Sequence, residues 1–247
     1  MALMGLMAGS VVGRFQKLVG RAVTAALSRQ RVEGMFSRYV SHQVARHLLD
    51  QGENTLTLPG RRCRVTVLMT DIRGFTTLSS KLPPEEVVSL LNDYFEKLVP
   101  QVFAHEGTLD KFIGDAMLIV FGAPLPQDDQ EIRACRLALA LQRVVAEVSA
   151  ERSRRGHPAV QMGIGINTGD VVAGIVGAPE RQEYTVLGDP VNVTARLEGI
   201  AAGGTILMTE ATYRRVADRV RATPLPPVMV KGKAEPLVIY QLLEVLT

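Results

Sequence analysis

Two aspartates stand at the ends of apolar runs, and their placement could hold a metal ion. Asp71 ends the run Val65–Thr70, and Asp115 lies in a short turn between residues 109–112 and 116–121. If these runs pair as neighbouring strands, both carboxylates emerge at one end of a sheet, close enough to share a divalent cation. An aspartate at a strand end is also a common turn or cap residue, so neither one establishes a metal site by itself.

The residues after Asp71 favour an anion beside such a metal. The segment 72–77 places Gly74, Thr76 and Thr77 where the chain turns from a strand into a helix. Backbone N–H groups can converge on an anion at such a turn. Magnesium binds a few carboxylates together with substrate phosphate oxygens, so two aspartates suffice without histidine or cysteine ligands.

A polar pair further along the chain could meet the same substrate. Asn192 and Arg196 are four residues apart in a predicted helix, with Asp189 suited to its N-cap and Pro190 to its first turn. Residues at this spacing share one helix face. Taken alone, the pair also fits an ordinary solvated face.

Apolar periodicity predicts the elements that must position these residues. Strands are expected at 63–70, 159–167, 170–176, 205–208, 225–230 and 236–244, a hairpin at 107–121, and helices from Pro84, at 128–154 and at 209–218. A turn is expected at Asn167–Asp170. The opening order β-α-β-β-α-β predicts an α+β fold with a ferredoxin-like core, in which the helices pack on one face of a largely antiparallel sheet.

Composition narrows the class of protein. The 247 residues are 47% apolar, enough for a globular core, and the two cysteines, Cys63 and Cys135, show no metal-ligand spacing and suit a reducing cytosol. Residues 1–49 hold seven basic residues and one acidic residue, a net charge of +6, so the total of +3 leaves −3 for residues 50–247. An acidic body argues against nucleic-acid binding.

The N-terminal part forms a separate segment in this interpretation. Residues 1–50 are predicted to be basic and helical, with a signal-transmitting or dimerising role, 51–60 to be a linker, and 61–247 to be the catalytic domain. The apolar run Ala2–Val12 falls short of the about 20 residues that span a bilayer. It could be the remnant of a membrane span, an interfacial anchor or the start of a soluble helix. We expect a cytoplasmic protein, with attachment to the inner face of the membrane left open.

Four segments together resemble a known family. They are Asp71-Ile-Arg-Gly-Phe-Thr76, Lys111-Phe-Ile-Gly-Asp115, Gly188-Asp-Pro-Val-Asn192-Val-Thr-Ala-Arg196 and Val230-Lys231-Gly-Lys233. In order and spacing across residues 61–245 they resemble the signature segments of class III nucleotidyl cyclases. The resemblance implies attack of a ribose 3′-hydroxyl on the α-phosphorus of a nucleoside triphosphate, giving a 3′,5′-cyclic nucleotide and pyrophosphate.

The resemblance also implies roles for individual residues. Asp71 and Asp115 would hold two divalent cations, Mg²⁺ or Mn²⁺, with the carbonyl of Ile72 as an added ligand. Asn192 would orient the ribose and Arg196 would stabilise the charge at phosphorus. The turn residues Gly74, Phe75 and Thr76 and the later Lys231 would contact substrate, whereas Lys233 is expected to be a solvated turn residue.

Two residues bear on the choice of base. In the family, an amine four residues before the second aspartate, with Asp or Thr seven before the asparagine, favours adenine, whereas Glu with Cys favours guanine. Lys111 and Thr185 occupy these positions. Lysine can donate to adenine N1, and a threonine oxygen can accept from the exocyclic amine. The resemblance therefore implies ATP as the substrate of an adenylate cyclase.

The site implied by the family is shared between two chains. Metal aspartates and base residues would belong to one protomer and the asparagine-arginine helix to the other, so we expect a symmetric homodimer with two equivalent sites. Two alternatives stay open: a guanylate or mixed cyclase, and a catalytically silent dimerisation or nucleotide-sensing module. The second would predict the loss of Asp71, Asp115, Asn192 or Arg196, and all four are present.

Overall fold

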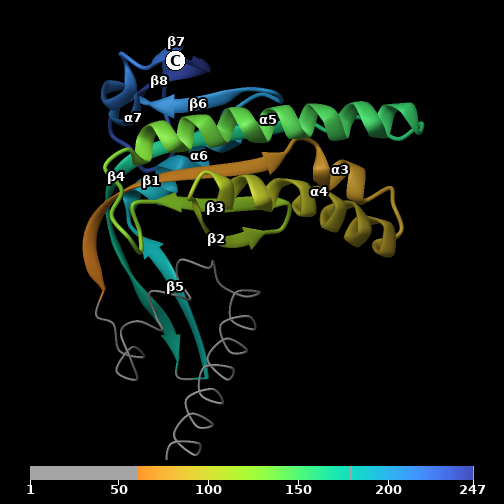
Figure 1. Ribbon diagram of the computed structural model, residues 1–247, viewed down its shortest axis with the longest axis horizontal. Coiled ribbons are helices and arrows are strands. Elements are labelled where there is room, and N and C mark those ends of the chain that lie inside the picture. The colour runs from red at the N-terminus through yellow and green to blue at the C-terminus, as the bar shows by residue number, and fades with distance from the viewer. Residues whose placement is uncertain (1–59, 179, 247) are drawn as a thin grey trace, which may run out of the picture. The chain divides into compact units, whose positions relative to one another are not determined.

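The computed structural model describes residues 60–178 and 180–246, within the second of the chain's two units, residues 51–247. In this part of the chain, eight strands form one mixed sheet in the order β2-β3-β1-β4-β6-β8-β7, with β5 paired to β4 beside this path (Figure 1). The strands are β1 (Arg61–Ile72), β2 (Thr108–Ile113), β3 (Ala116–Phe121), β4 (Met162–Ala178), β5 (Arg181–Leu187), β6 (Ile206–Thr209), β7 (Val220–Val228) and β8 (Leu237–Val245).

Strand β1 lies inside the sheet, between β3 and β4. It pairs antiparallel with β3 on one side and with β4 on the other, and β4 continues into a parallel pairing with β6. Every residue of β3 is buried, as its unbroken apolar sequence predicts for a strand covered on both faces. Because Thr70 pairs with Met117, the end of β1 lies beside the turn that contains Asp115.

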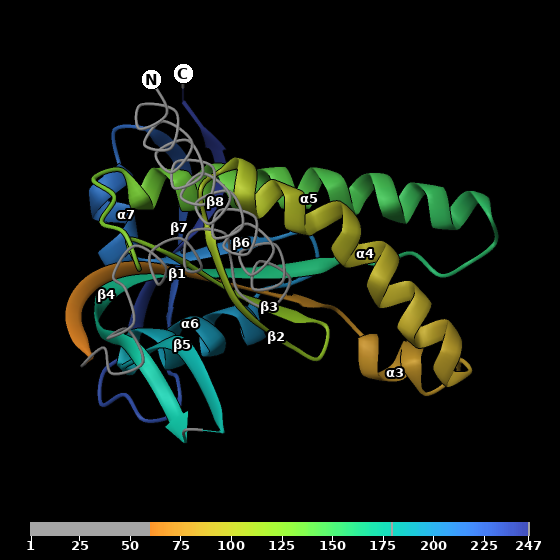
Figure 2. The same cartoon turned by 60° about the horizontal axis from the view of Figure 1, so that its bottom comes forward.

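Two long helices cover one face of the sheet. They are α4 (Pro84–Ala104) and α5 (Gln130–Arg154), which lie side by side in both views (Figures 1 and 2). Helix α4 opens with proline and two glutamates, which suit a helix N-terminus, and α5 ends with Arg152 and Arg154, which suit a C-terminus. Buried residues of both helices share one large core with β1, β3, β4 and β6. The shorter helices α3 (Phe75–Ser79) and α7 (Glu210–Val216) complete this layer.

Helix α6 (Asp189–Ile200) packs on the opposite face of the sheet. Its Leu197 and the following Ala201 meet Leu207 and Ile239 in a separate core, whereas the neighbouring Met208 faces the large core with α5. The backbone of α6 comes very close to β4 at Gly165, where a Cβ would lie 2.6 Å from the backbone nitrogen of Glu198 and 2.8 Å from the carbonyl oxygen of Thr194. This glycine therefore sets how closely α6 docks on the sheet.

Replacing Gly165 by alanine should lower the free energy of unfolding by about 2–3 kcal/mol, because rigid backbone cannot move aside for the methyl group. Urea unfolding of the purified domain measures the change. Gly199→Ala, in α6 itself, is the control, since a Cβ at Gly199 would meet nothing within 4 Å. Alanine at this helical position should stabilise by up to about 1 kcal/mol. Equal effects of the two substitutions would contradict the close packing of α6.

The predicted fold class is confirmed in the described residues. The order β1-α4-β2-β3-α5-β4 is the expected ferredoxin-like unit, and α4 and α5 cover the same face of the sheet. The predicted hairpin and the long helix at 128–154 also match, within two residues at each end. The N-terminal helical segment 1–50 and the linker, apart from Gly60, lie outside the described residues.

Three local predictions were wrong. The turn expected at Asn167–Asp170 is instead continuous β4, paired with residues 64–67 of β1. The polar side chain of Asn167 is satisfied by tertiary contacts: it donates to the Pro190 carbonyl oxygen at 3.1 Å and accepts from the Thr209 hydroxyl at 2.7 Å. Helix α6 takes Gly188 rather than Asp189 as its N-cap, and β7 begins at Val220, five residues before the predicted start.

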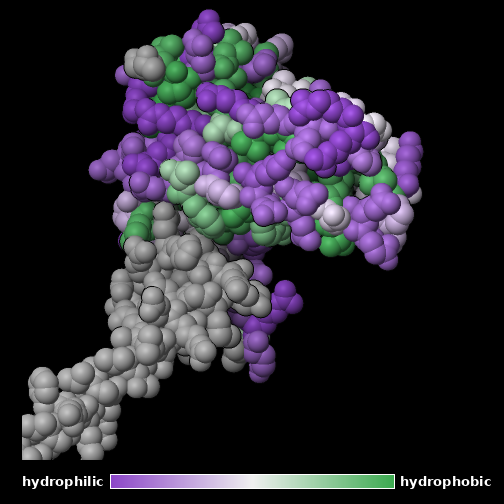
Figure 3. All heavy atoms as spheres, turned by 45° about the vertical axis from the view of Figure 1, so that its right-hand side comes forward, coloured by the Kyte–Doolittle hydropathy of each residue, from purple (hydrophilic) through white to green (hydrophobic). Residues whose placement is uncertain are grey.

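The surface is mainly polar on the side drawn in the space-filling view. Hydrophilic residues cover most of the coloured face, and hydrophobic residues show in separate areas (Figure 3). Among the helices of residues 60–178 and 180–246, none combines the length and the apolar character that a membrane span requires.

Candidate active site

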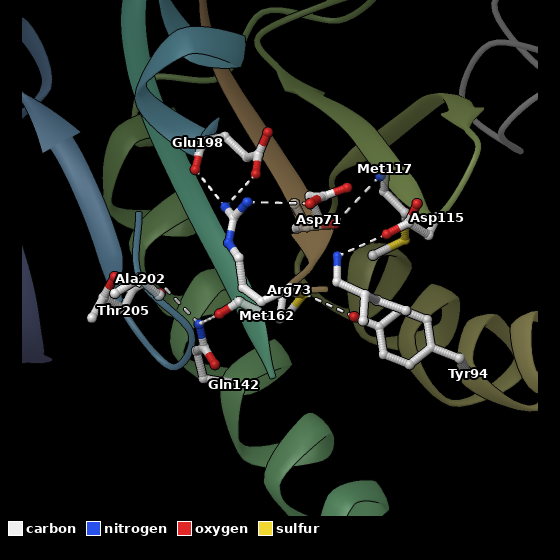
Figure 4. A network of polar contacts seen from close by, with 12 residues as sticks. Asp71, Arg73, Tyr94, Asp115, Met117, Gln142, Met162, Glu198, Ala202 and Thr205 are labelled. Carbon is white, nitrogen blue, oxygen red and sulfur yellow. Dashed lines mark hydrogen bonds and ion pairs between the residues drawn. The ribbon is translucent and has the colours of Figure 1, made fainter. Parts of the chain in front are cut away.

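Asp71 and Asp115 lie together at the ends of neighbouring strands, as predicted. Asp71 is the penultimate residue of β1, and Asp115 follows Gly114 in the turn between β2 and β3, where Gly114 has a φ of 65°. The backbone N–H of Ile72 donates to Asp115 Oδ2 at 3.0 Å, which ties the turn to the end of β1 (Figure 4). The tight turn, which favours glycine, thus brings the second carboxylate to the first.

The electrostatics of the pair favour a bound cation. Burial, together with the nearby carboxylates of Asp115 and Glu198, raises the pKa of Asp71 to about 7, and Arg73 opposes the shift. Like charges that share a partly buried site disfavour ionisation of one another. A divalent cation between the carboxylates would remove this repulsion.

Arg73 and Glu198 form a link that the sequence did not suggest. The Arg73 guanidinium lies between two carboxylates: Nη1 is 3.2 Å from Asp71 Oδ2, and Nη2 donates both to the side chain and to the main-chain carbonyl of Glu198 in α6 (Figure 4). Gly163 of β4 leaves room for this guanidinium, because a Cβ there would collide with it. Arg73 and Glu198 are 125 residues apart, so no local pattern pairs them.

The donors present fit a hard cation that also binds substrate. No group of three or more His, Cys, Asp or Glu side chains gathers as a metal site in the described part of the chain. Asp71, Asp115 and the Ile72 carbonyl would be the donors at this end of β1, since Arg73 holds the nearby Glu198 carboxylate. Mg²⁺ and Mn²⁺ accept such a set when substrate phosphates and water complete the coordination.

The turn after Asp71 has the predicted change of direction. Gly74 has a φ of 73° and precedes the five-residue helix α3, whose Leu78 N–H donates to the Gly74 carbonyl at 2.9 Å. Gly74 and Thr76 are exposed, and Phe75 is half-buried against the large core. These residues lie beside the aspartates because the turn follows β1 directly.

Lys111 and Thr185 meet at one buried carboxylate, Asp110. The Thr185 hydroxyl donates to Asp110 Oδ2 at 2.8 Å, and Lys111 Nζ lies 3.5 Å from Asp110 Oδ1 and 2.6 Å from Glu183 Oε2. Burial raises the pKa of Asp110, against the opposing effect of these donors. Burial alone would lower the pKa of Lys111, but the hydrogen bond to Glu183 and the charge of Asp110 raise it overall. Asp110 adjoins Lys111 in the chain, but no sequence pattern marks it as a member of this cluster.

The Asn192–Arg196 face of α6 points away from the Asp71 site of the same chain. Thr194 and Glu198 face β4, and Glu198 reaches Arg73. Asn192 is two residues from Thr194, and Arg196 is two residues from Glu198. At about 100° per residue, two residues correspond to a rotation of about 200°, so Asn192 and Arg196 lie on the other side of the helix. Arg196 lies instead against the turn at Gly232, where a Cβ would be 3.4 Å from its Nη2.

The turn between β7 and β8 brings the two late lysines to α6. Lys231 is exposed. Lys233, expected to be a solvated turn residue, is 31% exposed and forms an ion pair with Asp189 Oδ2 at 2.5 Å. This contact fixes the turn at the first residue of α6.

Fold and site together define a class III nucleotidyl cyclase catalytic domain. The chain belongs to the family described as the adenylate and guanylate cyclase catalytic domain, whose model matches residues 59–244. It is 36% identical over 215 residues to adenylate cyclase 1 of Rhizobium meliloti, a match that covers 85% of this chain and 32% of that protein. The chain thus spans about a third of the length of the curated relatives it matches.

Solved structures of two cyclases share the fold. The guanylyl cyclase Cya2 superposes with a TM-score of 0.73 at 40% identity, covering 76% of this chain and 95% of that one. The adenylyl cyclase CyaB from P. aeruginosa gives 0.74 at 33% identity, covering 76% and 97%. Overall structural similarity therefore does not indicate whether this chain uses an adenine or a guanine nucleotide.

Proposed function

We propose that this domain is an adenylate cyclase, which converts ATP into 3′,5′-cyclic AMP and pyrophosphate. The observation that carries the proposal is the cluster of Lys111 and Thr185 around Asp110, in the same protomer as Asp71 and Asp115. Lysine offers a donor to adenine N1, which is an acceptor, and the threonine oxygen can accept from the exocyclic amine. Guanine carries a proton at N1 and an oxygen at C6, so both contacts would be mismatched.

The remaining site residues suit the cyclisation. Two divalent cations, Mg²⁺ or Mn²⁺, held by Asp71, Asp115 and the Ile72 carbonyl would lower the pKa of the ribose 3′-hydroxyl and neutralise the triphosphate. Gly74, Phe75 and Thr76 would face the phosphates, and Lys231 would contact the triphosphate. From α6, Asn192 would orient the ribose, and Arg196 would stabilise the charge that develops at the α-phosphorus.

A second copy of the chain is part of this proposal. Asn192 and Arg196 point away from the aspartates of their own chain, which supports their acting at the site of a partner. Large apolar side chains are exposed on and beside the β4–β5 hairpin and at the end of β2: Val172, Val176, Leu187, Phe112 and Ile113. Exposed apolar side chains of this size on paired strands favour burial in an interface. The active form would then be a homodimer with two equivalent sites.

A guanylate cyclase is the second candidate, favoured by the 40% identity to Cya2. The deciding experiment incubates the purified protein with ATP or GTP and with Mg²⁺ or Mn²⁺, and identifies the cyclic products by mass. We expect cyclic AMP from ATP as the main product. Cyclic GMP as the main product would show a guanylate cyclase instead. If neither metal supports formation of a cyclic product, both candidate functions are rejected.

Exchanging the base contacts should reverse the preference. In the double variant Lys111→Glu with Thr185→Cys, the carboxylate can accept from guanine N1, and adenine loses its donor. Each mismatched buried group costs about 1–3 kcal/mol, so the ratio of kcat/KM for ATP to that for GTP should fall by about a hundredfold. Product formation from each nucleotide measures the ratio. An unchanged ratio in a folded, active variant would place base selection elsewhere.

A further inference from the structure

Strand β2 carries an irregularity at one residue of the base cluster. The register with β3 passes from Leu109 opposite Ile119 directly to Lys111 opposite Leu118, so Asp110 has no partner of its own. In a regular strand, neighbouring side chains point to opposite faces, whereas a bulge re-aims them. Asp110 and Lys111 both reach β5 here, at Thr185 and Glu183, which share one face of that strand. The bulge therefore aims two successive side chains at the same place.

Asp110 determines which hydrogen bond Thr185 can offer. The Asp110 side chain is 4% exposed, and its Oδ2 accepts a hydrogen bond from the Thr185 hydroxyl at 2.8 Å, with a further hydrogen bond from the Val186 backbone. An ionised carboxylate only accepts, so the Thr185 hydroxyl must act as the donor to it. The lone pairs of Thr185 Oγ1 are then left for another donor. Thr185 is only 6% exposed, so it offers little surface to a base. Its contribution to base recognition therefore depends on whether its hydroxyl donates or accepts a hydrogen bond.

We propose that Asp110 is a positioning residue for base choice: it holds Thr185 Oγ1 as an acceptor and Lys111 as a donor, and so selects a purine with an amino group at C6 over one with an oxygen. This inference rests on the proposed nucleotide cyclase function and deepens it. Asp110 acts through its two neighbours and does not touch the base. Without it, the Thr185 proton is free to turn outward and to donate to a C6 oxygen.

The variant Asp110→Asn keeps the shape of the side chain but changes its polarity. The Thr185 hydroxyl and the Val186 N–H donate to the carboxylate, and Lys111 Nζ forms an ion pair with Oδ1 at 3.5 Å without a hydrogen bond. Asparagine offers one acceptor oxygen and two donor hydrogens, so it cannot serve all three. We expect the kcat/KM for ATP to fall about tenfold, as for the loss of one hydrogen bond to a charged group.

Purine riboside triphosphate, which lacks the exocyclic amine, isolates the contact to Thr185. It keeps the N1 acceptor for Lys111, so only the amine contact differs from ATP. The preference for ATP over this analogue should shrink about tenfold in Asp110→Asn, because the analogue never made the lost hydrogen bond. Glu183→Gln is the matched control, since it removes the other carboxylate at Lys111 without touching Thr185. It should leave this preference unchanged.

A merely structural role of Asp110 would give a different result. Equal losses for ATP and the analogue, or an unchanged preference in Asp110→Asn, would overturn the inference. If Asp110→Asn does not fold, Thr185→Val tests the same contact and should lose the same preference. If the double variant Asp110→Asn with Thr185→Val folds, its preference for ATP over the analogue should equal that of Thr185→Val alone. A further tenfold loss of this preference in the double variant would also overturn the inference.

Binding separates this inference from the proposed function. 3′-deoxy-ATP and 3′-deoxy-GTP lack the attacking hydroxyl and cannot cyclise, so titration calorimetry with Mg²⁺ measures recognition alone. If the wild-type protein makes no cyclic nucleotide, the proposed function fails. A preference for 3′-deoxy-ATP that Asp110→Asn removes would still support the role of Asp110, and a preference that Asp110→Asn leaves intact would reject it.

Discussion

Replacing Asp71 by asparagine should abolish cyclisation and, at the same time, make the metal-free domain more stable at alkaline pH. Loss of a carboxylate ligand should lower activity by about a hundredfold or more. Even the mutation of residues that only hydrogen-bond to metal ligands lowers metal affinity or activity about 10–100-fold. The stability effect has the opposite sign, because Asp71 is ionised above about pH 7 among the carboxylates of Asp115 and Glu198. Asparagine removes that repulsion.

The pH dependence follows from the direction of the shift. The pKa of Asp71 is raised from 3.8 to about 7 in the folded protein. Between these values the folded state keeps a proton that the unfolded state has lost, so the stability of the wild type falls as the pH rises from about 4 to about 7. The Arg73 contact and partial exposure of the side chain limit the size of the effect.

Unfolding of both proteins in EDTA, at pH 5 and at pH 8, measures the prediction. The free energy of unfolding of Asp71→Asn relative to the wild type should be higher at pH 8 than at pH 5, because the wild-type carboxylate is largely protonated at pH 5. Added Mg²⁺ should stabilise the wild type at pH 8 and have little effect on Asp71→Asn. Full activity of Asp71→Asn, or equal Mg²⁺ stabilisation of both proteins, would contradict the metal site.

The sequence predicted those parts of the site that depend on local order. Asp71 and Asp115 border apolar runs that were predicted to be strands, and the two aspartates meet because these strands do pair as neighbours. Gly74 marked the predicted turn from a strand into a helix, and in the structure its φ of 73° is one that glycine adopts readily. The long helix α5 was recognisable because its apolar residues recur at helical spacing over 25 residues.

Contacts between segments that are distant in the chain could not be predicted from the sequence. Asn167 and Asp170 are turn formers by type, yet pairing with β1 and the hydrogen bonds of Asn167 to Pro190 and Thr209 hold them in one strand. The Arg73–Glu198 link joins residues 125 apart, and only the packing of α6 on β4 brings them together. Asp110 escaped for a different reason: a regular strand would point it away from Lys111, and the bulge was not visible in the pattern.

Mixing two inactive variants should restore part of the activity if the site is shared between chains. Asp71→Ala removes a metal carboxylate, and Arg196→Ala removes the charge at the α-phosphorus, which should cost about a hundred- to a thousandfold. In a mixed dimer, one site receives both defects and the other receives none. Random exchange puts about half of the chains in mixed dimers with one intact site of two, so about a quarter of the wild-type activity should return.

The matched control mixes Asp71→Ala with Asp115→Ala. Asp71 at the end of β1 and Asp115 in the β2–β3 turn lie together in the same protomer, so each site of that mixed dimer keeps one damaged carboxylate and no activity should return. Energy transfer between differently labelled chains establishes that the subunits exchange. No recovery for Asp71→Ala with Arg196→Ala, despite exchange, would mean that α6 serves its own chain. Helix α6 would then have to turn its Asn192–Arg196 face toward Asp71 and give up the contact of Glu198 with Arg73.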